Sequence, residues 1–135
     1  MKPFMSVYNT QCYALMRIVV GFLFLWHGVQ KLFGIPIPIP GQIPPFITYV
    51  AGPIELVGGA LVMIGLLTRW AAFITSGQMA VAYWMAHGTK ALLPIQNMGE
   101  LAVLYCFVFL FISTQGGGIW SVDALLLGNG NRPAQ

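Results

Sequence analysis

Three ionisable side chains lie inside stretches of this chain that are otherwise apolar: His27, Glu55 and Glu100. A charged group on a helix in hydrocarbon is costly, so such residues indicate a functional site or a structurally paired group. Imidazole and carboxyl groups are the usual side chains for proton transfer, and desolvation moves a carboxyl pKa toward neutrality. We therefore predict His27, Glu55 and Glu100 as candidate catalytic residues.

Further polar residues accompany these three toward one end of the expected helices. The predicted ligand-binding set is His27, Lys31, Glu55, His87, Lys90, Asn97 and Glu100. No closely spaced ligand pair such as H-x-x-x-H is present, so we predict no metal site. The alternative interpretation is a buried hydrogen-bond network that holds helices in register, at about 0.6–2 kcal/mol per contact.

The composition indicates the elements that must position these groups. Of 135 residues, 58% are hydrophobic and only 7% are charged, whereas an ordinary soluble domain carries about 25% charge. A membrane span needs about 20 largely apolar residues, so the chain has room for four spans and little else. We predict an all-α fold, an integral membrane bundle of four transmembrane helices in one domain, residues 1–135.

The apolar runs set the expected boundaries. They predict helices at about residues 14–33, 48–68, 70–87 and 97–114, and a short interfacial segment at about residues 121–127. Alternating prolines between Gly34 and Pro45 exclude helix there and indicate a stiff connector or a lid over a site. Asn97 is placed to cap the fourth helix, with Glu100 three residues later, which is the structural interpretation of that glutamate.

Small and polar residues mark the faces that meet other helices. Glu55 and Gly59 share one face of the second helix, and Gly58 lies at its edge. Glycine beside a buried acid lets a second helix backbone approach closely. The predicted helix-packing residues are Arg17, Gly21, Gly28, Gly58, Gly59 and Gln78, the last expected to bond a neighbouring helix.

The charges predict an orientation. Four alternating spans put four basic residues on one side and two on the other, Lys31 and Lys90. By the positive-inside rule both termini are expected in the cytoplasm. Because helices rise 1.5 Å per residue, His27, Glu55 and Glu100 are then all expected ~8–10 Å below the outer rim. The six basic residues form no cluster, so no nucleic-acid binding is predicted.

An ordered set of short motifs resembles one membrane family. The set is Arg17 with Gly21, His27-Gly-x-x-Lys31, Glu55-Leu-Val-Gly-Gly, Gly65-Leu-Leu-Thr-Arg69, Asn97-x-Gly-Glu100 and Gly118-x-x-Ser-x-Asp123. Together, from Met16 to Asp123, these motifs resemble the DoxX family. The resemblance implies a small four-helix protein of the bacterial inner membrane. The family is named for its relation to DoxD, a membrane subunit of an archaeal quinol oxidase and thiosulfate:quinone oxidoreductase. Most of its members have no assigned activity.

Three functions fit these features. The first is an accessory or quinone-interacting subunit of a membrane redox system. Neither a C-x-x-C motif nor a haem-ligand pair is evident, so a partner subunit would supply the electrons. The second is a structural or assembly subunit in which the polar groups only fix the helices. The third is a small carrier or channel, which the one-sided polar groups favour least. Whether the chain is itself an enzyme, and whether it forms a homo-oligomer, stays open at this point.

Overall fold

The structure is a computed structural model that describes residues 4–126 and 128. Every regular element in that part of the chain is helical. The long helices are α1 (Asn9–Phe33), α2 (Gly52–Ile64), α3 (Thr68–Tyr83) and α5 (Glu100–Gln115). The short ones are α4 (Pro94–Asn97), α6 (Val122–Leu126), a 3₁₀ turn at Ser6–Tyr8, and π-helical turns at Ile47–Ala51 and Trp84–Gly88.

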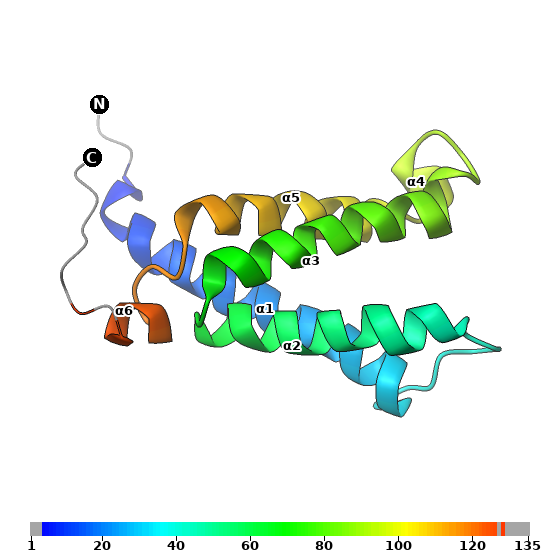
Figure 1. Cartoon of the computed structure of the whole chain (residues 1–135). Coiled ribbons are helices and arrows are strands. Elements are labelled where there is room, and N and C mark those ends of the chain that lie inside the picture. The colour runs from blue at the N-terminus through cyan, green and yellow to red at the C-terminus, as the bar shows by residue number, and fades with distance from the viewer. Residues whose placement is uncertain (1–3, 127, 129–135) are drawn as a thin grey trace.

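The long helices pack as two pairs. Figure 1 shows α1 against α2 in one layer and α3 beside α5 in the other, with α2 and α3 joining the layers. The connection after α1 and the segment with α4 lie at one end, and α6 lies at the opposite end. The core between the layers contains the fully buried Phe24, Val62, Phe109 and Ile112. Because the chain reverses at alternating ends, the four long helices alternate in direction, as the sequence predicts.

Two glycines end helices in the left-handed conformation. Gly34 (φ 68°) follows α1, and its N–H donates to the Gln30 carbonyl. Gly65 (φ 73°) follows α2 and donates to the carbonyls of Leu61 and Val62. Only glycine takes this conformation without a steric cost, so these residues close the helix ends. This explains why α2 ends at Ile64, four residues before the predicted end, and why α3 begins at Thr68.

Other boundaries differ as well. The expected start near residue 48 and the expected end near residue 87 fall in the π-helical turns Ile47–Ala51 and Trp84–Gly88. The first helix begins at Asn9 and not near residue 14, because no glycine or proline interrupts the polar turn before the apolar run. The predicted fourth helix is divided, since Met98 adopts a left-handed backbone (φ 60°) after α4 and α5 begins only at Glu100. The predicted interfacial segment corresponds to α6, and its last residue, Leu127, lies outside the described residues.

Close backbone contact joins α1 to α2. A Cβ atom added at Gly21 would lie 2.8 Å from the Gly59 carbonyl oxygen, and one added at Gly59 would lie 2.6 Å from the Leu25 nitrogen. One added at Gly28 would lie 2.7 Å from the Gly52 carbonyl oxygen. On the other side of α2, Gly58 faces the Thr75 side chain of α3. Gly21, Gly28 and Gly59 thus let the backbones of α1 and α2 touch, and Gly58 leaves room for the Thr75 side chain.

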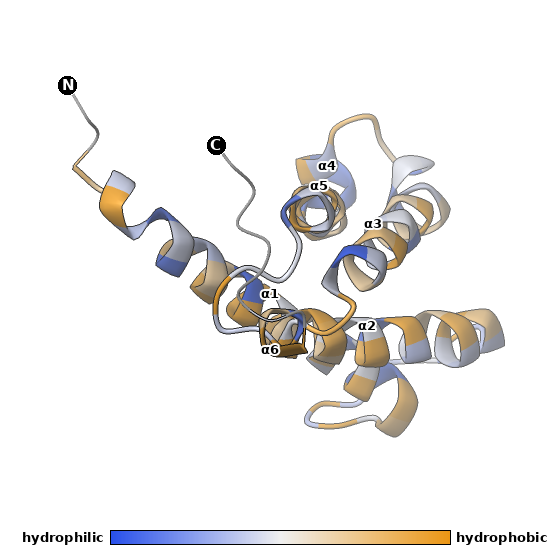
Figure 2. Cartoon of the chain, turned by 60° about the vertical axis from the view of Figure 1, so that its left-hand side comes forward, coloured by the Kyte–Doolittle hydropathy of each residue, from blue (hydrophilic) through white to orange (hydrophobic). Residues whose placement is uncertain are grey.

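The outer surface of the bundle is mostly apolar. Figure 2 shows hydrophobic residues, in orange, along all the long helices, and many of them are exposed, among them Leu15, Val57, Phe73 and Phe107. Within the described residues, two helical segments are long and apolar enough to cross a membrane, Ser6–Phe33 and Ile47–Ile64. Glu100–Gln115 is apolar but shorter. The architecture is thus an all-helical one with two candidate spans.

Candidate functional site

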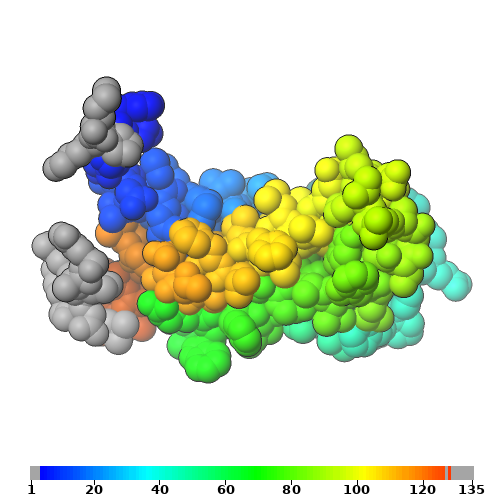
Figure 3. Space-filling model, turned by 90° about the horizontal axis from the view of Figure 1, so that it is seen from above, coloured from blue at the N-terminus to red at the C-terminus, as the bar shows by residue number. Residues whose placement is uncertain are grey.

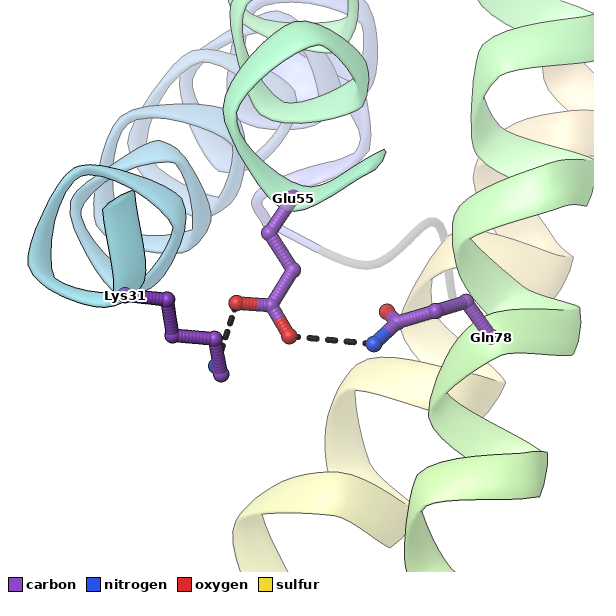
Figure 4. Close-up of polar contacts among 3 residues, drawn as sticks. All are labelled: Lys31, Glu55 and Gln78. Atoms are coloured by element: carbon purple, nitrogen blue, oxygen red, sulfur yellow. Dashed lines mark hydrogen bonds and ion pairs between the residues drawn. The ribbon is translucent and has the colours of Figure 1, made fainter. Parts of the chain in front are cut away.

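A charged cluster between α1, α2 and α3 forms the centre of the candidate site. Glu55 is 1% exposed. Lys31 forms an ion pair with its Oε2 atom, and Gln78 Nε2 donates to Oε1 across 3.0 Å. Figure 4 shows the carboxylate held between the two side chains. Three helices thereby contribute one residue each to a buried carboxylate, and Lys31 keeps part of its side chain in contact with solvent.

Glutamine is well suited to a neighbour that changes its protonation state. Its amide carries both a donor and an acceptor, and the two exchange places when the amide rotates. Gln78 Oε1 is buried and has no hydrogen-bond partner within the described part of the chain. The amide can therefore donate to a carboxylate at Glu55, as observed, or accept from a carboxylic acid there after rotation.

His27 lies on α1 one turn before Lys31 and forms one wall of a niche. The niche has a volume of about 170 Å³ and is lined by Trp26, His27, Gln30, Pro36 and Ile37. Gln30 Nε2 donates to the Ile37 carbonyl across 2.9 Å and so attaches the proline-rich segment to α1. The other side of the imidazole meets the edge of Tyr105 on α5, with 5.9 Å between the ring centres. His27 therefore separates an apolar niche from the interior.

A second polar cluster closes the connection between α3 and α5. His87 Nδ1 lies 2.9 Å from the Asn97 carbonyl oxygen, and its ring stacks on Tyr83. The Asn97 amide donates to Tyr83 Oη and to the Ala91 carbonyl, while its Oδ1 accepts from the Gly99 N–H. The polar groups of Asn97 are thus used within its own loop. These contacts hold the connection closed, which is a structural role.

The structure therefore divides the predicted cluster. His27, Lys31 and Glu55 lie together with Gln78, whereas His87 and Asn97 pair with each other. Glu100 is the exposed first residue of α5 and not a residue one turn inside it, because the chain turns at Met98. Within residues 4–126, Glu100 makes no hydrogen bond or ion pair to the other cluster members. Lys90 is exposed as well.

Several residues of the niche were not among the predicted site residues. Gln30 lies three residues after His27 and four after Trp26 on α1, a spacing that places neighbours on one helix face. That spacing was a usable signal. Tyr105 and the contact of Ile37 with α1 depend on the packing of α5 and on the path of the proline-rich segment, which periodicity does not give. The part of the chain described holds no group of three histidine, cysteine or acidic residues positioned for a metal.

The opposite end of the bundle is closed by capping interactions. Arg17 is fully buried and donates to the carbonyls of Val62, Met63 and Trp120. Asp123 accepts from the N–H groups of Leu67 and Thr68, at 2.8 and 3.0 Å, and from the Thr68 hydroxyl. A side chain beyond α5 therefore caps the start of α3, and an α1 arginine satisfies the last carbonyls of α2.

The contacts of Asp123 also change the pKa of its carboxyl. Partial burial raises its pKa, but the hydrogen bonds from Thr68 and Leu67 and the charge of Arg17 lower it more, so the pKa lies below the ordinary value. Arg69 similarly donates to the carbonyls of Ser113 and Gln115 at the end of α5. The motifs around Gly65 and Asp123 thus have a structural explanation at this end.

Fold and site together define a small helical protein with apolar outer faces, a buried carboxylate paired with a lysine, and capped helix ends. The family model for DoxX matches residues 13–88. An uncharacterized Haemophilus influenzae protein is 40% identical over 122 residues, which cover 86% of this chain and 91% of that protein. This chain belongs to the DoxX family.

Two further relatives carry descriptive names. An uncharacterized membrane protein of Mycobacterium tuberculosis is 34% identical over 131 residues, covering 82% of this chain and 78% of that protein. A Bacillus subtilis protein named "Putative oxidoreductase CatD" is 44% identical over 59 residues, covering 41% of this chain and 44% of that protein. No solved structure matches the chain. Family and relatives point to a membrane location.

Proposed function

We propose that this protein is a quinone-interacting accessory subunit of a redox system in the bacterial inner membrane. In this proposal the chain spans the membrane four times with both termini in the cytoplasm. The niche beside His27 and the Lys31–Glu55–Gln78 cluster then face the outer half of the bilayer. The observation that carries the proposal is the buried Glu55, held by Lys31 one helical turn after a histidine whose ring lines an apolar niche.

The chemistry of a quinone fits this arrangement. A quinone has an apolar tail, which stays in lipid, and a head with two carbonyl oxygens. His27 would donate a hydrogen bond to one carbonyl in the niche, with Trp26 and Ile37 against the ring. Reduction to the quinol takes up two electrons and two protons. The electrons would come from a partner subunit that carries a redox cofactor, because this chain shows no motif for one.

Glu55 would act as the proton-exchanging group. This residue is 1% exposed, so any proton that its carboxyl exchanges would move through neighbouring groups and not directly to bulk water. Lys31 stabilises the carboxylate form of Glu55, and Gln78 can bond either protonation state. His27 and Lys31 lie one helical turn apart. One of the two protons would pass from Glu55 toward the histidine along this shared face, and the other would come from solvent.

Binding can be tested directly with the tryptophan of the niche. A short-tailed benzoquinone should quench the fluorescence of Trp26 when the purified protein is held in lipid nanodiscs. Trp26→Phe should remove this quenching. His27→Leu should weaken binding about tenfold or more, as expected for loss of one charge-assisted or well-placed hydrogen bond. Trp70, exposed on α3, gives the matched control, since Trp70→Phe should leave the saturable quenching intact.

The structural alternative is favoured by a specific observation, because both Glu55 oxygens already have partners. In that case the cluster only joins three helices. The quinone site would be rejected if the wild-type protein showed no saturable quenching. It would also be rejected if His27→Leu showed the same quenching as the wild type, and the structural alternative would then remain.

A further inference from the structure

The surface over α4 and the start of α5 carries a broad apolar groove. Its volume is about 770 Å³, and its lining residues are Pro94, Ile95, Met98, Glu100, Leu101, Val103 and Leu104. In Figure 3 α5 crosses the face toward the viewer, and the segment with α4 stands at one end of it. The niche beside His27 is lined by other residues, so the groove is a separate feature.

Part of this groove lies outside the proposed membrane spans, where contact with lipid tails does not account for an apolar surface. Ile95 is 70% exposed and Met98 is 84% exposed, and both belong to the connection between the proposed third and fourth spans. Met98 has a left-handed backbone (φ 60°), which a non-glycine residue adopts only under strain. The strained turn presents the methionine side chain outward. Exposed apolar patches of this kind mark contacts with another protein or with the membrane.

The charges near the groove favour a protein contact and indicate which protein binds there. Glu100 is an exposed carboxylate among the apolar lining residues. Lys90 is exposed in the same connection. The one ion pair formed within residues 4–126 joins Lys31 to Glu55, so the described chain gives neither Glu100 nor Lys90 an opposite charge. A carboxylate that becomes buried in an apolar contact needs a cation to pair with it.

We propose that the groove is the interface of a homodimer, in which Glu100 pairs with Lys90 of a second copy and the reverse pair forms as well. A twofold axis along the membrane normal keeps every residue at its own depth. Glu100 and Lys90 lie at the same end of the bundle. This symmetry therefore places Glu100 of one copy at about the same depth in the membrane as Lys90 of the other. The contact is then isologous and closed. The proposal rests on the four-span orientation and is independent of quinone binding.

Charge reversal and rescue test this interface. Copies labelled with donor or acceptor dyes at the exposed Cys12 are placed in lipid vesicles, and energy transfer is measured as the protein-to-lipid ratio falls. Glu100→Lys and Lys90→Glu should each weaken association about tenfold or more, because like charges then face each other. The double variant should restore association to near the wild-type value. Gln42→Lys, an added charge on the other connection of the same end, is the control and should associate as the wild type does.

Glu100→Gln keeps the shape of the side chain and guards against misfolding of the reversal variants. It should weaken association while leaving the helical circular dichroism unchanged. A wild-type protein that stays monomeric at high protein-to-lipid ratio would overturn the proposal. So would a dimer whose affinity is unaffected by the single reversals, or one that the double variant fails to restore.

Discussion

Gly28 provides the sharpest test of how α1 and α2 pack. A Cβ atom at this position would lie 2.7 Å from the Leu56 Cα and from the Gly52 carbonyl oxygen, and closer still to the Leu56 nitrogen. Ordinary van der Waals contact begins near 3.4 Å. All three atoms are backbone, so no side chain can rotate away. Gly28→Ala must therefore separate the two helices or bend one of them.

The magnitude follows from two opposing effects. Overpacking by one methyl group in a rigid contact costs about 1–3 kcal/mol. Replacing a mid-helix glycine with alanine gains about 0.5–1 kcal/mol. Gly77, in the middle of α3, isolates the second effect because a Cβ atom there has no neighbour within 4 Å. Gly77→Ala should stabilise the protein, whereas Gly28→Ala should be less stable than Gly77→Ala by about 1–3 kcal/mol.

The comparison is made on the free energy of unfolding, measured in one detergent by denaturant titration of the two variants and the wild type. The propensity gain is common to both variants, so their difference reports the helix contact alone. A Gly28→Ala protein as stable as Gly77→Ala would refute the close contact of α1 with α2. It would also remove the basis for placing Lys31 against Glu55.

Three other predictions concern the capped end and the orientation. Arg17→Gln should lower the free energy of unfolding by at least about 2 kcal/mol, because buried carbonyls of α2 lose their charged donor; a thermal unfolding temperature equal to that of the wild type would contradict this. The lowered pKa of Asp123 means that its caps stabilise the fold above the ordinary carboxyl pKa, and that this contribution is lost as pH falls through the lowered value. Asp123→Asn should therefore flatten the acid limb of the stability profile, and an unchanged limb would exclude the role. Reporter fusions at Gln135 and within Gly41–Gln42 should report opposite sides of the membrane, while equal sidedness would reject four spans.

Sequence periodicity predicts the helical class and the order of the four long helices, because apolar runs separated by glycine and proline are strong local signals. It also predicts that Gln78 bonds a neighbouring helix. The hydrogen bond from its amide to Glu55 is present. A lone amide in an apolar helix must find a polar partner, so burial alone indicates the contact, although not its identity.

The position of Glu100 could not be obtained in the same way. The sequence around Asn97 is compatible with a helix that begins there, and only the left-handed turn at Met98 separates α4 from α5. Three residues of displacement move the glutamate from inside the helix to its exposed first position. Local signals also did not show that the Asn97 amide donates to Tyr83 and Ala91, because those contacts depend on how the loop closes.

The capped end shows a different limit. Gly65-Leu-Leu-Thr-Arg69 and the segment around Asp123 are far apart in sequence, and nothing local relates them. Their pairing follows from the return of the chain after α5, which places the Asp123 carboxylate over the first N–H groups of α3. A tertiary cap of this kind becomes visible only when the helices are arranged in space.

Proton exchange by Glu55 is the central claim of the proposed function, and infrared difference spectroscopy tests it most directly. Spectra of the protein with a bound quinone are recorded before and after electrochemical reduction, in light and in heavy water. We expect a carboxylic-acid band that changes on reduction, shifts in heavy water and disappears in Glu55→Gln. Lys31 can reach solvent, so this variant should still fold. A spectrum without a carboxylic-acid band, or with the same band in folded Glu55→Gln protein, would contradict the account.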